Sequence, residues 1–240
     1  MNDHELAAFL AKDAGQILLD LQTYWDRDQA LLGKAGDAQA NAYLVRALQD
    51  VRPDDGLLSE EEKDNPDRLS QSRVWIVDPV DGTREYGEGR TDWAVHVALA
   101  IDGKPVIGAV ALPGLGLVLR TDQPQPLPIA PAIPRMVVSR TRPAKEALYV
   151  AEKIGAELIP MGSAGAKAMA IVRGEAEIYL HSGGQYEWDS CAPAAVALAH
   201  GLHVSRIDGS PMVYNQRDVY MPDLLICRPE WADRILSLLN

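Results

Sequence analysis

The stretch Val74-Trp75-Ile76-Val77-Asp78-Pro79-Val80-Asp81-Gly82-Thr83 carries the clearest structural signal in the chain. It begins with four consecutive apolar residues, which predict a buried β-strand over 74–77. Pro79 disfavours the helical conformation for Asp78, so we expect the strand to end at Asp78-Pro79 without running on into a helix. The turn that follows can bring the carboxylates of Asp78 and Asp81 together at the end of the strand.

Oxygen ligands dominate this turn. The Val80 carbonyl lies between the two carboxylates, and an all-oxygen ligand set suits Mg²⁺ rather than zinc or copper. Gly82 lets a ligand approach the backbone closely, and the N–H groups of Gly82 and Thr83, at the start of a short helix, can hold a phosphate oxygen. An Asp-Pro-x-Asp-Gly segment taken alone is more often a surface turn. The choice between the two interpretations depends on acids elsewhere in the chain.

Two other segments supply such acids. Glu60 follows a short apolar strand predicted at 57–58, and Asp189 lies at the start of a helix predicted over 188–200. Each has an ordinary explanation when taken alone, a solvated run of charge for Glu60 and a helix N-cap for Asp189. Together with the Asp-Pro-x-Asp-Gly segment they form the set of carboxylates that a two-metal phosphatase needs.

The composition limits the possible functions. The chain has 240 residues, of which 47% are hydrophobic, and a formal net charge of −11. This acidity argues against nucleic-acid polymers and anionic membranes as partners, and a phosphate substrate would require bound cations to reverse the local field. No apolar run approaches the ~20 residues of a membrane span, and the acidic N-terminus lacks the features of a secretory signal. Because Cys191 and Cys227 are the only cysteines, we expect reduced core residues and a cytoplasmic protein.

Mixed strands and helices are predicted throughout the chain. A proline-rich segment, Thr121 to Arg135, is the expected boundary between an N-terminal half, 1–134, and a C-terminal half, 135–240. The alternation predicts an α/β layered sandwich with a cleft where the halves meet. Helices are predicted over 3–24, 37–51, 143–154, 163–173, 188–200 and 229–239. Strands are predicted over 57–58, 74–77, 93–101, 105–112, 116–120, 136–139, 157–161, 176–180 and 224–227.

Three segments, taken in order, resemble the signature motifs of the inositol monophosphatase superfamily of lithium-sensitive phosphatases. They are Ser59-Glu60-Glu61, Trp75 to Thr83, and Trp188-Asp189. The resemblance implies a five-layered αβαβα fold, hydrolysis of a small soluble phosphoester, and two or three Mg²⁺ ions as cofactor. Relatives are often dimers, so it also allows a homodimer.

The resemblance assigns roles to individual residues. The implied metal ligands are Glu60, Asp78, the Val80 carbonyl, Asp81 and Asp189. Glu60 would also face a third, weaker metal site, and Thr83 would help to position the attacking water. The family usually supplies an acid partner for this threonine from an upstream threonine-and-aspartate motif that the chain lacks. Asp37 is the available acid, although a helix N-cap is an equally good explanation for it.

Further features resemble one branch of the superfamily, the actinobacterial CysQ-type 3′-phosphoadenosine 5′-phosphate phosphatases. Glu85 stands where the inositol branch usually has asparagine, and the segments 138–142, 162–167 and 208–211 are similar to that branch. The implied reaction removes the 3′-phosphate of adenosine 3′,5′-bisphosphate to give AMP, in sulfate assimilation. A phosphatase of inositol 1-phosphate or fructose 1,6-bisphosphate is the alternative, and a non-catalytic metal-binding protein is a third.

The residues expected to bind substrate are Gly82, Thr83, Ser139, Arg142, Ser163 and Lys167. Arg142 and Lys167 are the candidates for the second phosphate of a nucleotide. A lysine side chain has few structural reasons to lie in a helix start rich in glycine and alanine. This favours a functional role for Lys167. For Arg142, an ordinary solvated surface arginine is about as good an explanation. His96 is interpreted as a packing or surface residue.

Overall fold

The apolar run at 74–77 lies in the second strand of a five-stranded sheet. The computed structural model describes residues 1–26, 28 and 31–240. The order of the first sheet is β1-β2-β3-β4-β5; β1 and β2 are parallel and the other pairs are antiparallel. The strands are β1 (Gly56–Ser59), β2 (Arg73–Asp81), β3 (Ala94–Ile101), β4 (Lys104–Leu112) and β5 (Leu117–Arg120).

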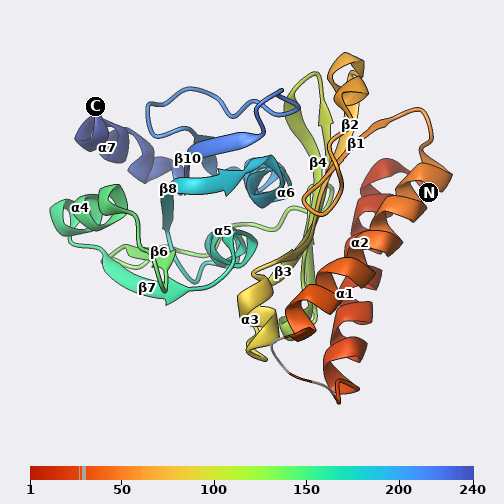
Figure 1. Ribbon diagram of the computed structural model, residues 1–240. Coiled ribbons are helices and arrows are strands. Elements are labelled where there is room, and N and C mark those ends of the chain that lie inside the picture. The colour runs from red at the N-terminus through yellow and green to blue at the C-terminus, as the bar shows by residue number, and fades with distance from the viewer. Residues whose placement is uncertain (27, 29–30) are drawn as a thin grey trace.

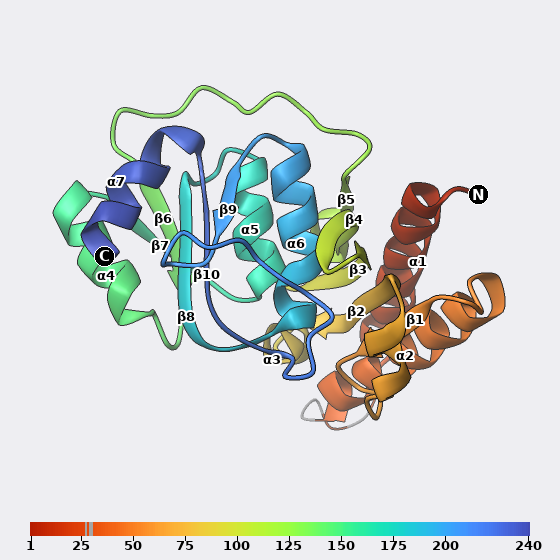
Figure 2. The ribbon, with the colours of Figure 1, turned by 90° about the horizontal axis from the view of Figure 1, so that it is seen from above.

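A second five-stranded sheet has the order β7-β6-β8-β10-β9. Strand β6 is parallel to both of its neighbours, and β10 is antiparallel to both of its own. The segment 121–134 connects the two sheets without forming a helix or strand, and Figure 2 shows it running from β5 to β6. The strands are β6 (Arg135–Ser139), β7 (Glu157–Met161), β8 (Ile178–Tyr186), β9 (His203–Ser205) and β10 (Tyr220–Cys227).

Pairs of helices separate and cover the sheets (Figures 1 and 2). Helices α1 (Asp3–Thr23) and α2 (Leu32–Val51) cover the outer face of the first sheet. Helices α5 (Ala164–Val172) and α6 (Glu187–Ala199) lie between the two sheets. Helices α4 (Lys145–Ile154) and α7 (Pro229–Leu239) cover the outer face of the second sheet. This αβαβα order confirms the predicted five-layered sandwich.

The apolar run of β2 is continuous because both of its faces are buried. Val74 and Ile76 pack in the cluster that includes α5 and α6, whereas Trp75 and Val77 pack in the cluster that includes α1 and α2. The alternation of side chains along a strand therefore assigns successive residues of one run to two different cores.

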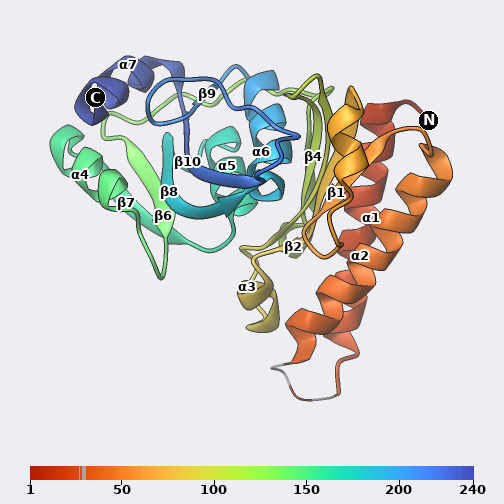
Figure 3. The same ribbon diagram turned by 45° about the horizontal axis from the view of Figure 1, so that its top comes forward.

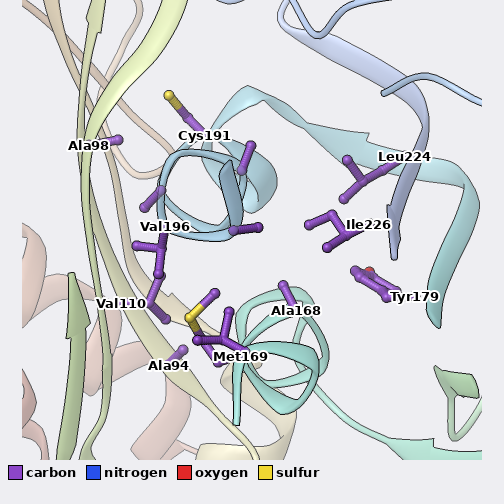
Figure 4. Packing of buried hydrophobic residues seen from close by; sticks show 14 of the residues in the cluster. Ala94, Ala98, Val110, Ala168, Met169, Tyr179, Cys191, Val196, Leu224 and Ile226 are labelled. Atoms are coloured by element: carbon purple, nitrogen blue, oxygen red, sulfur yellow. The ribbon is translucent and has the colours of Figure 1, made fainter. Parts of the chain in front are cut away.

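The middle layer joins the two sheets into one core (Figure 4). Met169 of α5 and Val196 of α6 lie in one cluster with Val110 of the first sheet and Ile226 of the second. Cys191 belongs to the same cluster and is fully buried. Because α5 and α6 touch both sheets, a side chain at the start of either helix can meet the ends of strands in both.

Several element boundaries differ from the sequence expectations. Helix α2 begins at Leu32 rather than near 37, so Asp37 lies inside the helix and the N-cap explanation for it is wrong. The N-cap of α1 is Asn2, whose side chain accepts a hydrogen bond from the N–H of Glu5. Strand β2 continues through Pro79 to Asp81, which is possible because its pairing with β3 is irregular between Asp78 and Asp81.

In the second sheet, β8 and β10 are longer than predicted, and the three-residue edge strand β9 was not predicted. Such a short strand shows no usable periodicity. Two short 3₁₀ segments, Pro66–Ser70 and Pro113–Leu115, were also not predicted. Among the helices formed by the described residues, none has the length and hydropathy needed to cross a bilayer.

Candidate active site

Asp81 connects the two halves at the end of β2. Its Oδ1 accepts a hydrogen bond from the N–H of Ala164 at 3.0 Å. Its Oδ2 accepts from the Ser163 hydroxyl and from the N–H of Gly165, each at 2.5 Å. Helix α5 therefore presents its N-terminal donors to this one carboxylate, an arrangement that the positive end of the helix dipole favours.

The turn after Asp81 starts α3 (Thr83–Gly87). Gly82 has φ +91°, a left-handed conformation, and a Cβ atom at this position would lie 3.0 Å from the Ser163 Cβ. Both constraints require glycine. Figure 3 shows α3 at the lower edge of the first sheet, on the side that faces the second sheet.

Three carboxylates converge in this region. Among the described residues, one oxygen each of Asp78, Asp81 and Asp189 lies within 4.8 Å of the other two. Asp78 and Asp81 come from β2, whereas Asp189 is the third residue of α6. Its Oδ2 accepts from the N–H of Tyr186, so Asp189 closes a capping box and is not itself the N-cap.

Burial and, after it, the crowding of like charges raise the pKa values of Asp78, Asp189 and the nearby Glu60. Burial, reinforced by the neighbouring acids, raises the pKa of Asp78 well above its usual value and the pKa of Asp189 to about 7. Burial of its carboxyl end, together with the charges of Asp37 and Glu61, raises the pKa of Glu60 to about 7. These groups cannot all be ionised at neutral pH without a cation nearby.

Asp81 behaves in the opposite way. Burial alone would raise its pKa, but the charge of His96 and the hydrogen bonds from Ser163 and Gly165 outweigh burial and lower the pKa to about 2. A carboxylate with a lowered pKa thus lies beside carboxylates with raised pKa values. The ligand atoms are all oxygen, two of the three converging carboxylates are buried, and the cluster carries excess negative charge. This combination fits one or more divalent cations such as Mg²⁺.

Cation binding at this cluster should depend on pH. Since Glu60 and Asp189 have pKa values of about 7 without a cation, each must lose a proton before it can act as a ligand. For each such group we expect the affinity for Mg²⁺ to weaken by about tenfold from pH 8 to pH 6. Isothermal titration calorimetry at both pH values measures this change, and an affinity that is equal or tighter at pH 6 would contradict it.

The same shifts predict how the cation-free protein responds to pH. Unfolded carboxyl groups titrate near pH 4, so between about pH 4 and pH 7 the folded chain holds more protons than the unfolded chain. Stability contributed by Glu60 and Asp189 is therefore lost as pH rises through this window. We expect Mg²⁺ to raise the melting temperature more at pH 8 than at pH 6. Asp189→Asn should bring the increases in melting temperature that Mg²⁺ causes at pH 8 and at pH 6 closer together.

Thr83 and Asp37 meet near the cluster. The Thr83 hydroxyl lies 3.4 Å from Asp37 Oδ1 and 3.2 Å from the Val80 carbonyl oxygen, and it can donate its proton to either. Burial, assisted by the charge of Glu61, raises the pKa of Asp37 to about 7. With its proton engaged, the hydroxyl oxygen can accept a hydrogen bond from a water. The predicted pairing of Thr83 with Asp37 is thus present as a contact, whereas its catalytic role stays a prediction.

His96 was not predicted to belong to the site. It is fully buried in β3, its Nδ1–H donates to the Trp188 carbonyl at 2.9 Å, and its Nε2 lies 3.2 Å from Asp81 Oδ2. Burial opposes protonation, but the charge of Asp81 outweighs it and raises the pKa of His96. His96 therefore connects Asp81 to the residue before Asp189. The available signal was a polar residue inside an otherwise apolar strand.

Lys167 has a structural reason for its position, contrary to the sequence argument. It is 5% exposed, and its Nζ donates to the carbonyl oxygens of Gly162 and Ser163. Burial lowers the pKa of the Lys167 ammonium group to about 8. Because the ammonium group is enclosed and already bonded, this arrangement does not support direct contact with a second phosphate. Lys167 instead holds the loop whose donors bind Asp81.

Arg142 and Ser139 lie elsewhere, in a pocket of about 390 Å³ between β6, α4 and β8. Arg142 is exposed, and its N–H donates to the Ser139 hydroxyl at 3.2 Å. Lys145 and His181 also line this pocket. Burial lowers the pKa of His181, so this side chain adds no positive charge at neutral pH. The pocket also contains one carboxylate, Glu146, so Arg142 and Lys145 leave its lining with a small excess of positive charge that suits an anionic group.

The expected substrate contacts thus fall into three places. Gly82 and Thr83 are at the start of α3, Ser163 and Lys167 support Asp81, and Ser139 and Arg142 line the separate pocket. Their contacts with a substrate stay predictions.

The two cysteines are free and buried, as expected. Burial raises the pKa of Cys191 well above its usual value and the pKa of Cys227 to about 12. Neither thiol would be ionised at neutral pH, so neither has the properties of a nucleophile.

Comparisons with known proteins identify close relatives of this arrangement. The model of the inositol monophosphatase family matches residues 10–240. The 3′-phosphoadenosine 5′-phosphate phosphatase of Mycobacterium bovis is 50% identical over 236 residues, covering 94% of this chain and 88% of the relative. The 3′(2′),5′-bisphosphate nucleotidase CysQ of Escherichia coli is 28% identical over 199 residues, covering 78% of this chain and 81% of the relative.

Among solved structures, CysQ from Bacteroides thetaiotaomicron superposes with a TM-score of 0.80. The two chains share 26% sequence identity, and the match covers 93% of this chain and 96% of the other. An inositol monophosphatase from Staphylococcus aureus has a TM-score of 0.79 at 19% identity, which shows the shared fold alone.

Proposed function

This chain belongs to the inositol monophosphatase family and is a phosphatase, and we propose that it removes the 3′-phosphate of adenosine 3′,5′-bisphosphate with the help of Mg²⁺. The products are AMP and phosphate, and the reaction clears a by-product of sulfate assimilation. The observation that carries the proposal is the set of three converging carboxylates beside the amides of α3. The 50% identity to a protein named as a 3′-phosphoadenosine 5′-phosphate phosphatase supports this substrate.

The cations fit the residues that surround them. Asp78, Asp81, Asp189, Glu60 and the Val80 carbonyl would hold two or three Mg²⁺ ions. When bound, Mg²⁺ supplies Lewis-acid polarisation of the phosphoryl group and neutralises its charge. A cation-loaded cluster also explains how a chain with net charge −11 attracts an anion.

The chain's own groups then orient the reactants. The N–H groups of Gly82 and Thr83, at the start of α3, would bind a phosphoryl oxygen whose charge grows during transfer. The Thr83 hydroxyl, with its proton donated to Asp37 or to the Val80 carbonyl, would hold the attacking water in line with the leaving oxygen. Asp37, with a pKa of about 7, could accept a proton through that hydroxyl.

The second phosphate of the nucleotide requires its own recognition. The pocket with Arg142 and Lys145 supports a 5′-phosphate site, because both side chains are cationic and the pocket is open to solvent. A monophosphorylated polyol has no second anionic group to place in this pocket. This pocket is the feature that favours the nucleotide over inositol 1-phosphate.

A parallel assay of three substrates tests the proposal. With Mg²⁺, we expect kcat/KM for adenosine 3′,5′-bisphosphate to exceed that for inositol 1-phosphate and fructose 1,6-bisphosphate by about tenfold or more. Release of phosphate measures each rate, and Arg142→Ala should narrow the difference. A preference for either of the other substrates would keep the phosphatase chemistry and reject the nucleotide assignment.

A further inference from the structure

Glu85 joins α3 to the second sheet. It is 7% exposed, and its Oε1 accepts a hydrogen bond from Arg140 Nε at 2.6 Å. Arg140 is the first residue after β6, so this bond crosses from one half of the chain to the other. A second bond runs from the Arg140 Nη2 to Glu88 Oε2 at 2.7 Å. Since the Glu88 side chain is 46% exposed, the bond to buried Glu85 is the stronger constraint.

The surroundings of Glu85 leave it little freedom. Its side chain packs against Gly162, where a Cβ atom would overlap it. The N–H of Gly162 donates to Asp92 Oδ2 at 2.6 Å, and the N–H of Arg140 donates to the Met161 carbonyl at 3.1 Å. Glu85 is thus held between the turn after β7 and the loop after β6. Any movement of Arg140 relative to α3 would break a short, charge-assisted bond.

Both elements that Glu85 touches carry candidate substrate contacts. The turn after β7 leads to Ser163, which binds Asp81. The loop after β6 carries Arg142, which follows Arg140 by two positions in the sequence. The Arg142 side chain lines the 390 Å³ pocket. At the start of α3, two residues before Glu85, Thr83 belongs to the reaction site. One ion pair therefore connects the phosphoryl-transfer site to the pocket for a second anionic group.

We propose that Glu85 and Arg140 are positioning residues that set the distance between the reacting phosphate and the Arg142 pocket, and so determine the preference for a substrate with two phosphates. This inference rests on the proposed function. Neither side chain needs to touch the substrate. A shorter side chain such as asparagine at position 85 would not reach Arg140, and the loop after β6 would lose its anchor on α3.

The test compares two substrates on the same enzyme preparations. Adenosine 3′,5′-bisphosphate carries both phosphates, whereas adenosine 3′-monophosphate lacks the second. For Glu85→Gln, Glu85→Asn and Arg140→Met, we expect the KM for the bisphosphate to rise about tenfold while kcat/KM for the monophosphate changes less than twofold. Because both substrates report on one preparation, the fraction of folded enzyme cancels from the ratio.

The design includes a double variant, a conservative variant and a remote control. The double variant Glu85→Gln with Arg140→Met should prefer the bisphosphate over the monophosphate no less than the more affected single variant does. We expect this because the two groups act as a unit. Arg140→Lys, which keeps the charge, should recover part of the preference. Arg120→Met breaks an ion pair with Asp122 at the end of β5. This remote variant should leave the ratio of kcat/KM for the bisphosphate to kcat/KM for the monophosphate unchanged.

Three results would overturn the inference. An equal fall in kcat/KM for both substrates would indicate a purely structural role for Glu85 and Arg140. A wild-type preference that survives in all three single variants would show that the pair does not set it. A wild-type enzyme with no preference for the bisphosphate would reject the proposed substrate as well, which separates that failure from the other two.

Discussion

Asp81→Asn is expected to lower the rate of phosphate release by about a thousandfold or more. The substitution changes one oxygen to an amide nitrogen and leaves the size of the side chain unaltered. It removes a carboxylate that the charge of His96 and the hydrogen bonds from Ser163 and Gly165 keep ionised, because they lower the pKa of Asp81 to about 2. Both cation binding and phosphate binding depend on that negative charge and on the cations it retains.

The geometry around Asp81 makes asparagine a poor replacement. The carboxylate accepts bonds from Ser163, Ala164 and Gly165 through both of its oxygens. The asparagine NH₂ group can only donate, so at least one of these donors would face another donor. We therefore expect the melting temperature to fall as well, and activity must be compared below the melting transition of the variant.

Asp223→Asn is the matched control. Asp223 is also a buried carboxylate, and it accepts two bonds from Arg206 and one from the N–H of Ile207. It lies in β10 outside the acid cluster, so this variant should lose stability while its kcat stays within about twofold of wild type. Asp81→Asn with activity within tenfold of wild type would remove Asp81 from the cation site.

The acid cluster shows what could be predicted from the sequence. The sequence placed Asp78 and Asp81 near the end of a buried strand because apolar continuity is a local signal, although the strand does not end at Pro79 and continues to Asp81. Glu60 and Asp189 joined them through a motif order spread over the chain, and Asp78, Asp81 and Asp189 do converge within 4.8 Å. Local signals also predicted an α/β layered sandwich, since each apolar run and each amphipathic helix has its own period, whereas the number of five layers came from the family resemblance.

Long-range partners were beyond the reach of the sequence. His96 reads as one polar residue in an apolar strand, and only the fold shows that it contacts Asp81. Lys167 reads as an unexplained cation because the two carbonyl groups it binds belong to its own helix start and are defined only after folding. Glu85 and Arg140 are 55 residues apart, and no periodicity links them.

The start of α2 illustrates a different limit. Asp37 carries an N-cap signature, but tertiary packing extends the helix back to Leu32. That extension places Asp37 on the second turn, where its carboxylate can face Thr83. The same residue therefore changes from a helix start signal to a candidate partner in proton transfer, because the packing of α2 outweighs the local preference.

Thr83→Val is expected to lower kcat by about a hundredfold while KM changes little. Valine has nearly the same shape and the same β-branching, so α3 should keep its conformation. It lacks the hydroxyl oxygen that we expect to hold the attacking water, whereas the backbone N–H of residue 83 still binds the phosphate. Steady-state kinetics at saturating Mg²⁺, together with the melting temperature, measure the effect.

Two companion variants locate the source of this loss. Thr83→Ser keeps the hydroxyl and should retain most of the activity. Asp37→Asn should lower kcat by about tenfold, which is less than the loss from Thr83→Val. The reason is that the hydroxyl proton can still be donated to the Val80 carbonyl at 3.2 Å. If Asp37 acts only through Thr83, adding Asp37→Asn to Thr83→Val should cause little further loss. A Thr83→Val enzyme that retains a third or more of the wild-type kcat would show that the water is held by other groups, and Asp37 would then lose its proposed part in the reaction.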